Sequence, residues 1–187
     1  MSQLTGYDKF IQQALKYGFS LWGTAKSGQK TKYRTGDDGD LQKGYPRSGP
    51  RFKDNGDGTI TDNATGLMWV KEPGACGGAF GSPGSPSQMT WNNAIDNCLA
   101  LDYAGHNDWR LPNIKELASI IDYEVWLPSI DSVFFPYTQN WYYWSSTTYF
   151  PASASAWAIY FMDGSIDYYN TKTIDTFFVR PVRLGVS

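Results

Sequence analysis

The chain has 187 residues, enough for one domain that buries its own core without depending on disulfides or metals. Its formal net charge of -2 makes it a weak candidate for binding nucleic acids or other polyanions. The sequence contains neither an apolar run of roughly 20 residues, as needed to cross a membrane, nor the basic and apolar regions of a signal peptide. We therefore expect cytoplasmic synthesis, no membrane insertion and no nucleic-acid partner.

Aromatic residues are abundant, with 8 Trp, 13 Tyr and 10 Phe making up 17% of the chain. Charged residues make up only 18%, and the 19 Gly and 10 Pro add many turns. Such a composition is typical of a turn-rich β domain or of a binding surface, where tyrosine and tryptophan supply contact area.

The N-terminal stretch predicts a helical arm. Apolar residues recur at three- and four-residue spacings from Tyr7 to Phe19, which favours a short amphipathic helix. Residues 23–50 show no periodicity, and we expect extended or looped chain there. This places an N-terminal arm at residues 1–26 and the main domain at residues 27–187.

A hairpin is predicted next, followed by an irregular segment. Residues 58–70 favour two strands with a turn at 63–66, where Gly66 can adopt a positive φ. Residues 72–88 are rich in Gly, Pro and Ser, and we expect no helix or strand in them.

Two helices are predicted after this segment. Thr90 can cap the first, and Asn113 followed by Glu116 matches a capping box for the second. Their apolar faces consist of Trp91, Ala94, Ile95, Cys98 and Leu99 in the first helix, and of Ile114, Leu117, Ala118 and Ile121 in the second.

The C-terminal part predicts strands. Residues 156–162 and 165–170 flank Asp163–Gly164, a two-residue hairpin turn, and a final strand covers residues 177–184, with Pro181 favouring an edge or bulge. Strands, two helices and further strands without a βαβ repeat predict an α+β fold. We expect two helices packed on a small, twisted, mostly antiparallel sheet with long loops.

The two-residue turn sets the pairing of the C-terminal hairpin, so that Met162 would face Ser165 and Tyr160 would face Asp167. Side chains then alternate between an apolar face directed to the core and a mixed face. The apolar face comprises Trp157, Ile159, Phe161, Ile166 and Tyr168, and the mixed face Ala158, Tyr160, Met162, Ser165, Asp167 and Tyr169. The mixed face suits a binding surface or an ordinary solvent-exposed one. We expect Trp69, Trp109, Trp144 and Trp157 to be buried.

Residues that could carry catalysis or bind metal are few. The single histidine, His106, has no evident nucleophile to serve, which favours a structural role. Asp54–Asp62 resembles a calcium loop, but Gly56, Gly58 and Thr65 stand where an EF-hand places carboxylates, so we interpret it as a turn. Cys76 and Cys98 form either one disulfide or two free thiols. We expect no catalytic residue, no metal and no cofactor.

Several segments together resemble one known family: Asn55–Trp69, Gly105–Leu117, Tyr143–Tyr149, Ala156–Trp157, Phe161, Gly164 and Phe178–Arg183. The resemblance is to a bacterial and phage domain family that includes the C-terminal domain of a collagen-like adhesin, and it covers roughly residues 28–187. It implies a C-type lectin-like fold of the formylglycine-generating-enzyme subclass. Those enzymes use cysteines in their C-terminal part, and no cysteine follows Cys98, so the resemblance does not imply an enzyme.

Within that fold the chain is similar to variable proteins of diversity-generating retroelements, including those of archaeal viruses. In these proteins adenine-directed mutation rewrites chosen codons on a fixed scaffold. The resemblance implies a variable region at about 140–183, with a fixed framework of Trp144, Ser145, Ser146, Trp157, Phe161, Gly164, Val179 and Arg180. The ligand-binding positions that it implies are Tyr149, Phe150, Ala152, Ser153, Ala158, Tyr160, Asp163, Ser165, Asp167, Tyr168 and Tyr169. Met162 departs from the residue types expected of such mutation.

The leading hypothesis is a receptor-recognition module that displays a variable, tyrosine-rich surface to a protein or cell-surface ligand. The resemblance suggests a place on a virion or cell surface, with the N-terminal arm docking to a larger particle or oligomer. The alternative is an adhesin domain that binds glycans or glycosaminoglycans without diversification. Calcium-dependent sugar binding is not expected, because Glu72–Gly74 only approaches the lectin tripeptides.

Overall fold

The computed structural model describes residues 26–44 and 51–185, apart from the side chain of Tyr169. The helix expected between Tyr7 and Phe19 lies outside these residues. The described strands are β1 (Phe52–Asp54), β2 (Thr59–Asp62), β3 (Leu67–Val70), β4 (Gly81–Ser82), β5 (Ser85–Pro86), β6 (Tyr142–Thr148), β7 (Ser155–Tyr160), β8 (Ser165–Thr171) and β9 (Val182–Leu184). The helices are α2 (Asp38–Leu41), α3 (Trp91–Leu99) and α4 (Ile114–Ser119), with 3-10 helices η1 (Pro73–Cys76) and η2 (Gly78–Phe80).

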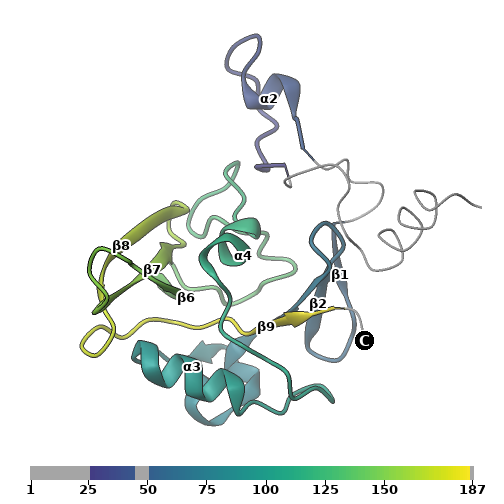
Figure 1. Ribbon diagram of the computed structural model, residues 1–187. Coiled ribbons are helices and arrows are strands. Elements are labelled where there is room, and N and C mark those ends of the chain that lie inside the picture. Colours follow the sequence, from purple (N-terminus) through teal and green to yellow (C-terminus); the bar gives the residue numbers. More distant parts are fainter. Residues whose placement is uncertain (1–25, 45–50, 186–187) are drawn as a thin grey trace, which may run out of the picture.

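The described strands form three sheets, in the orders β1-β2-β3-β9, β4-β5 and β6-β7-β8, with antiparallel neighbours throughout. This confirms the α+β expectation, whereas the expectation of one sheet is wrong. The reason is that the last strand crosses the molecule and pairs with the first hairpin, where Val182 faces Trp69 (Figure 1). The two hairpins therefore remain in separate sheets.

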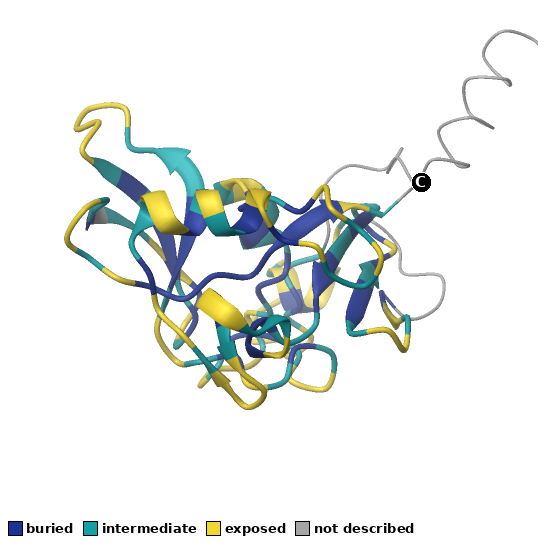
Figure 2. Cartoon of the chain, turned by 90° about the horizontal axis from the view of Figure 1, so that it is seen from below, coloured by how far each residue is buried: buried dark blue, intermediate teal, exposed yellow. Residues whose placement is uncertain are grey.

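The β6-β7-β8 sheet is covered on both faces. Ile159 belongs to a buried cluster with Leu117 of α4, and its neighbour Ala158 belongs to a second cluster with Ala94 of α3. Successive residues of a strand point to opposite faces, so each face of β7 packs against a different cluster. Figure 2 shows the resulting band of buried residues through the centre of the molecule, with exposed segments at the periphery.

The buried tryptophans follow the sequence expectation in three of four cases. Trp69, Trp109 and Trp144 each expose 1% or less of their surface. Trp157 is only half-buried, so the expectation for it is wrong. Because α4 covers Ile159 but Trp157 lies nearer the opposite end of β7, the apolar face of this strand is covered over only part of its length.

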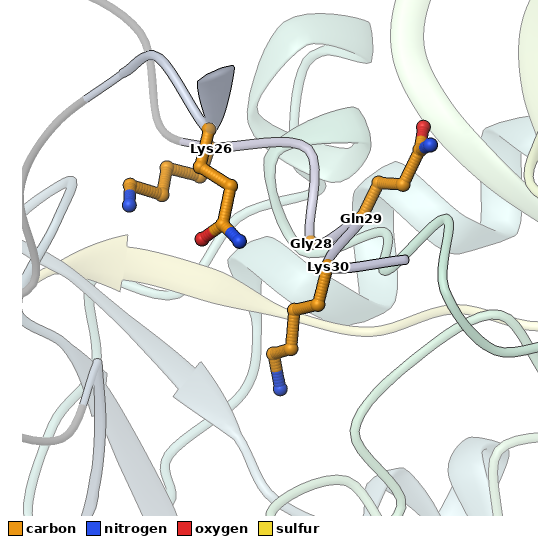
Figure 3. A pocket seen from close by; sticks show the side chains of 5 residues that line it. Lys26, Gly28, Gln29 and Lys30 are labelled. Carbon is orange, nitrogen blue, oxygen red and sulfur yellow. The ribbon is translucent and has the colours of Figure 1, made fainter. Parts of the chain in front are cut away.

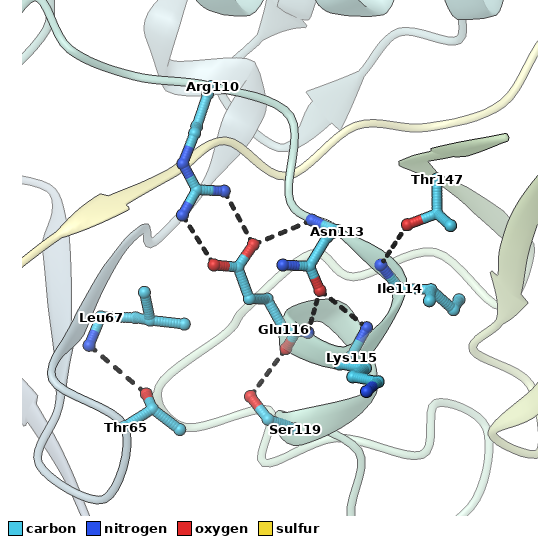
Figure 4. A network of polar contacts seen from close by, with 9 residues as sticks. All are labelled: Thr65, Leu67, Arg110, Asn113, Ile114, Lys115, Glu116, Ser119 and Thr147. Atoms are coloured by element: carbon cyan, nitrogen blue, oxygen red, sulfur yellow. Dashed lines mark hydrogen bonds and ion pairs between the residues drawn. The ribbon is translucent and has the colours of Figure 1, made fainter. Parts of the chain in front are cut away.

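The start of α4 is fixed by a polar network that the sequence pattern anticipates (Figure 4). The Asn113 side chain accepts hydrogen bonds from the backbone of Lys115 and Glu116, and Glu116 accepts one from the Asn113 backbone. Arg110 donates to both Glu116 oxygens at 2.6 and 2.7 Å. The Thr147 hydroxyl accepts a hydrogen bond from the backbone of the first helical residue, which ties α4 to β6.

The first hairpin also forms as expected, with Gly66 at a φ of 72° in its turn. The turn is held from inside by Asp62, which accepts hydrogen bonds from Arg51 at 3.0 and 3.1 Å and from the Ala64 backbone at 2.9 Å. Both charged side chains are almost entirely buried. Residues 55–58 connect β1 to β2, so the interpretation of Asp54–Asp62 as a turn leading into the hairpin is confirmed.

Other expectations need correction. Residues 72–88 contain η1, η2 and the β4-β5 pair, and residues 23–50 contain α2, because short local hydrogen bonds form without apolar periodicity. Leu99 is exposed, since the chain turns after α3 and Leu101 enters the core instead. The final strand is limited to β9, because Arg180 turns into the core and Pro181 has no N–H to donate.

The turn between β7 and β8 differs from the expected two-residue turn. Phe161 is fully buried, donates its backbone N–H to Trp141 and accepts from Ser129, so the chain leaves the ladder after Tyr160. Tyr160 therefore faces Ser165 and Ile159 faces Ile166, a shift of two residues from the expected register. Gly164 has a φ of 81°, and an added Cβ would lie 2.8 Å from Ile121.

Candidate functional site

An aromatic cluster lies on the same face of β7 as Ile159, at the end of the strand that α4 does not reach. Tyr149 stacks on Tyr168 with ring centroids 4.3 Å apart, and Trp157 lies edge-on to both, at 5.3 and 5.2 Å. All three side chains are half-buried. We call these three residues the Trp157 cluster. Trp157 and Tyr168 come from β7 and β8, and Tyr149 directly follows β6, where its backbone N–H donates to the Ser155 carbonyl.

A β-bulge positions one of these rings. Ala156 pairs with Asn170 and Ala158 with Asp167, so that Tyr168 and Tyr169 together stand opposite the single residue Trp157. An extra residue of this kind bends a strand and redirects side chains. The bulge thus places Tyr168 against Trp157 on the same face of the sheet.

A second aromatic group lies at the other end of the strands and on the opposite face. Tyr142 is stacked between Tyr160 and Phe177, with centroids 4.6 and 4.9 Å away, and Trp141 lies edge-on to both tyrosines. The Tyr142 hydroxyl donates to Asp167 at 3.2 Å. Burial and the nearby Asp167 carboxylate raise the pKa of Tyr142, so this hydroxyl remains protonated at neutral pH.

The loop between β6 and β7 borders the Trp157 cluster and is tied at several points. Tyr149 and Ser155 are joined by a backbone hydrogen bond of 3.0 Å, and the Lys172 ammonium donates to the Ser153 carbonyl at 2.9 Å. Between these ties, Phe150 exposes 92% of its surface, and Ala152 and Ser153 are also exposed. The loop therefore holds an aromatic side chain out into solvent.

The structure does not gather the sequence-predicted positions into one surface. Tyr149, Phe150, Ala152, Ser153 and Tyr168 lie at one end of the sheet, whereas Tyr160, Asp163 and Ser165 lie at the other end, about 17 Å away by strand length. Asp167 lies between them. The prediction that Ala158 lies at the surface is wrong, since it is fully buried in the cluster that contains Ala94 of α3. Tyr169 has no described side chain.

Three aromatic residues at these surfaces are absent from the sequence-predicted set. The alternation pattern places Trp157 in the core, and Trp141 and Tyr142 lie within the region at about 140–183 but are not among its predicted ligand-binding positions. One feature of the sequence could have indicated Trp141 and Tyr142, namely the run of four aromatic residues from Trp141 to Trp144. Successive residues of a strand point to opposite faces, so these four rings cannot all be buried on one face.

Beneath these surfaces a buried arginine holds the scaffold together. Arg180 donates to the carbonyl oxygens of Val70 and Lys71 at 2.9 and 2.6 Å and to the Thr138 hydroxyl at 2.7 Å. Its guanidinium also lies 5.1 Å from the Phe135 ring centroid. Burial lowers the pKa of this group, and neutral oxygens rather than a carboxylate solvate its charge.

The single histidine is held within the scaffold. His106 forms a backbone pair with Tyr103 and contacts Trp109 with its ring, in line with a structural role. Within residues 26–44 and 51–185 no group of three or more His, Cys, Asp or Glu side chains is placed to hold a metal ion. In the same ranges, no helix is both long and apolar enough to cross a membrane.

A small pocket of about 150 Å³ lies in the N-terminal segment, lined by Lys26, Gly28, Gln29, Lys30 and Gln42. Figure 3 shows Lys26 and Lys30 pointing in different directions. Gln29 donates to the Thr31 carbonyl at 3.0 Å. Because the two ammonium groups do not converge, the pocket is not a built anion site.

Residues 58–183 match the model of the Lcl C-terminal domain family. The chain belongs to this family. The Lcl C-terminal domain match begins after β1 and includes α3, α4, both hairpins and every aromatic residue described above, whereas it excludes residues 26–44. No curated protein matches the chain.

Proposed function

We propose that this chain is a binding module with a lectin-like scaffold, not an enzyme, and that the Trp157 cluster with the neighbouring loop forms its main ligand-binding surface. The observation that carries the proposal is the set of half-exposed rings from β7, β8 and the residue after β6, next to the almost fully exposed Phe150. Rigid aromatic side chains supply contact area at low entropic cost. Membership of the Lcl C-terminal domain family supports the same reading.

The proposed ligand is a protein or another cell-surface molecule, recognised from a virion or cell surface. Around the exposed rings lie short side chains, Ala152 and Ser153, that leave room for a partner. The Lys172 ammonium, which lies near the loop, is engaged by Thr148, by the Ser153 carbonyl and by the Trp91 ring. This surface therefore suits an uncharged or weakly charged epitope better than a polyanion. In this proposal the N-terminal arm attaches the module to a larger particle or oligomer.

The proposal includes diversification of this surface by a retroelement, of the kind found in archaeal viruses among others. Trp144 and Arg180, which the resemblance assigns to the fixed framework, are fully buried, whereas Phe150 and Ser153 are exposed. Changes at exposed loop positions leave such a scaffold intact.

Sequencing many copies of the gene from one population tests diversification. We expect substitutions at Tyr149, Phe150, Ala152 and Ser153, in codons that correspond to adenine-containing codons of the template, with none at Trp144. A template repeat and a reverse transcriptase gene nearby are expected as well. Invariant copies, or changes spread evenly over buried and exposed codons, would contradict diversification.

Binding itself is tested by displaying a library that randomises Phe150, Ala152 and Ser153 and selecting it against purified cell-surface proteins. We expect selected variants whose binding is lost on Tyr149→Ser and is unchanged in the presence of a metal chelator. A matched control library at exposed positions of α3, Asn92, Asn93 and Asp96, should yield no binders. Equal yields from both libraries would count against a dedicated surface.

A glycan-binding adhesin domain without diversification is the second candidate, because partly exposed aromatic rings also stack on sugars. Immobilised heparin and chondroitin sulfate are suitable probes. The net charge of -2 favours no binding of either at physiological salt. Saturable binding that is lost in Tyr149→Ser would favour the adhesin function over the first proposal.

A further inference from the structure

One loop outside the surface just described exposes several large apolar side chains in succession. Within residues 122–132, Trp126 exposes 71% of its surface, and Tyr123, Val125 and Leu127 are exposed as well. Isolated exposed apolar residues are ordinary, whereas a contiguous exposed apolar group is a mark of interaction surfaces.

The backbone holds this loop in place, so the exposure is built in. Asp122 donates its backbone N–H to the Ser129 carbonyl at 3.1 Å and closes the loop. Leu127 donates to the Met162 carbonyl at 2.9 Å, and Ser129 donates to that of Phe161 at 2.7 Å. Leu127 has a φ of 59°, a left-handed conformation that favours glycine. Trp126 therefore lies between Asp122 and Leu127, two residues whose backbones are anchored, and its side chain is exposed.

A cleft of about 380 Å³ lies beside Trp126. We call it the Trp126 cleft. Its lining includes the apolar residues Trp126, Leu127, Pro128 and Ile130, together with Asp122 and Asp131. This volume is within the range of sites that hold a small ligand or a single anchoring side chain.

The charge of the Trp126 cleft is negative. Asp122 accepts from the Glu124 backbone and Asp131 from the Val133 backbone, each with one oxygen at 3.0 Å. Neither carboxylate takes part in the ion pairs found in the described ranges, and the cleft lining contains no Lys or Arg. Each carboxylate therefore has an oxygen that can accept from a cationic ligand.

We propose that the Trp126 cleft binds an arginine side chain flanked by apolar residues on a partner protein. A guanidinium is planar, stacks on an indole and donates to carboxylates in a fork geometry, whereas an ammonium is more strongly hydrated. The flanking apolar residues would cover Val125 and Leu127. This proposal does not depend on the function proposed for the Trp157 cluster.

Titration of the full-length 15N-labelled chain tests the proposal, with the indole N–H signals as the readout. Trp126→Phe identifies the Trp126 signal by its loss. The probe is acetyl-Leu-Arg-Leu-amide, compared with the peptides that carry Lys or Gln in place of Arg. We expect a saturable shift of the Trp126 signal with the Arg peptide, weaker binding of the Lys peptide and a negligible effect of the Gln peptide.

The double variant Asp122→Asn/Asp131→Asn keeps a side-chain oxygen that accepts from each backbone N–H and removes both charges, so binding should weaken roughly tenfold. Asp96→Asn/Asp102→Asn is the matched control, because both residues are exposed and belong to α3 and the segment after it. Asp131→Asn alone serves if the double variant does not fold. An unmoved Trp126 signal, or equal affinity in the double variant, overturns the proposal. So does an equal shift with methyl galactoside, which would assign the cleft to sugars.

Discussion

The indole of Trp157 lies edge-on to the ring of Tyr168, with centroids 5.2 Å apart and planes inclined by 62°. Edge-to-face pairs of this kind contribute about 0.5–1.5 kcal/mol beyond the area that they bury. The pair therefore adds stability at the surface of β7 and β8, while both rings remain partly open to a ligand.

Replacement of Trp157 by alanine should cost less than replacement of a core tryptophan. We expect Trp157→Ala to lower the free energy of unfolding by about 1–2 kcal/mol, because it removes two ring contacts but leaves no closed cavity. Trp144→Ala should lower it by about 3–5 kcal/mol. Urea unfolding of both variants measures the difference. Equal losses would mean that Trp157 is buried in solution.

Ala158 and Phe150 separate a scaffold position from a surface position. Ala158→Tyr should destabilise the chain by about 3 kcal/mol or more, because Ala158 is enclosed by the buried cluster that contains Ala94 of α3, and a larger side chain would overpack it. Phe150→Tyr should change stability by less than about 0.5 kcal/mol. Thermal melts of the two variants provide the comparison. A normal melt for Ala158→Tyr would restore Ala158 to the variable set.

Arg51 and Asp62 form a buried ion pair, and removal of only one partner should be costly. Asp62→Ala should destabilise by about 3–5 kcal/mol, because it leaves the Arg51 guanidinium buried without its counter-charge and frees the Ala64 N–H. Arg51→Met/Asp62→Leu should recover part of this loss. Denaturant midpoints of the two variants measure the effect. A double variant as unstable as Asp62→Ala would show that the turn contact dominates over the ion pair.

Both cysteines are free, and burial raises the pKa of their thiols, that of Cys76 to about 12. Because the folded pKa lies above the unfolded value near 9, the thiols contribute full stability below pH 9, and this contribution falls as the pH rises above it. For the fully buried Cys98 the decline should approach about 1.4 kcal/mol per pH unit. Urea unfolding from pH 8 to 11 should give a shallower decline for Cys98→Ala. Identical slopes would show that Cys98 reaches solvent.

The sequence pattern located the elements whose signals are local. The capping box of Asn113 and Glu116 and the turn at Gly66 form as predicted, because nearby residues alone satisfy their hydrogen bonds. The Asp163–Gly164 turn was misplaced because the fate of Phe161 depends on Ser129 and Trp141, which are distant in sequence. No local rule could indicate that both faces of β7 are covered. Ala158, which was expected at the surface, is therefore buried, and Trp157, which was expected in the core, is only half-buried.

The candidate site shows the same division. The resemblance predicted that the loop around Phe150 belongs to the ligand-binding surface, and Phe150, Ala152 and Ser153 are indeed exposed. Their partition between two ends of the sheet was not, because it depends on a two-residue change in register and on the bulge opposite Trp157.

The crossing of the chain from Phe177 to Leu184 has a consequence for synthesis. These last segments join Met89, Tyr143, Arg110 and Trp69 by strand or bridge pairing, so they connect parts of the molecule made much earlier. A ribosome must therefore finish residues 177–184 before the two halves can close on one another. Any frameshift or premature stop arising in residues 140–176 would remove this closure, and the altered product would be exposed to proteolysis.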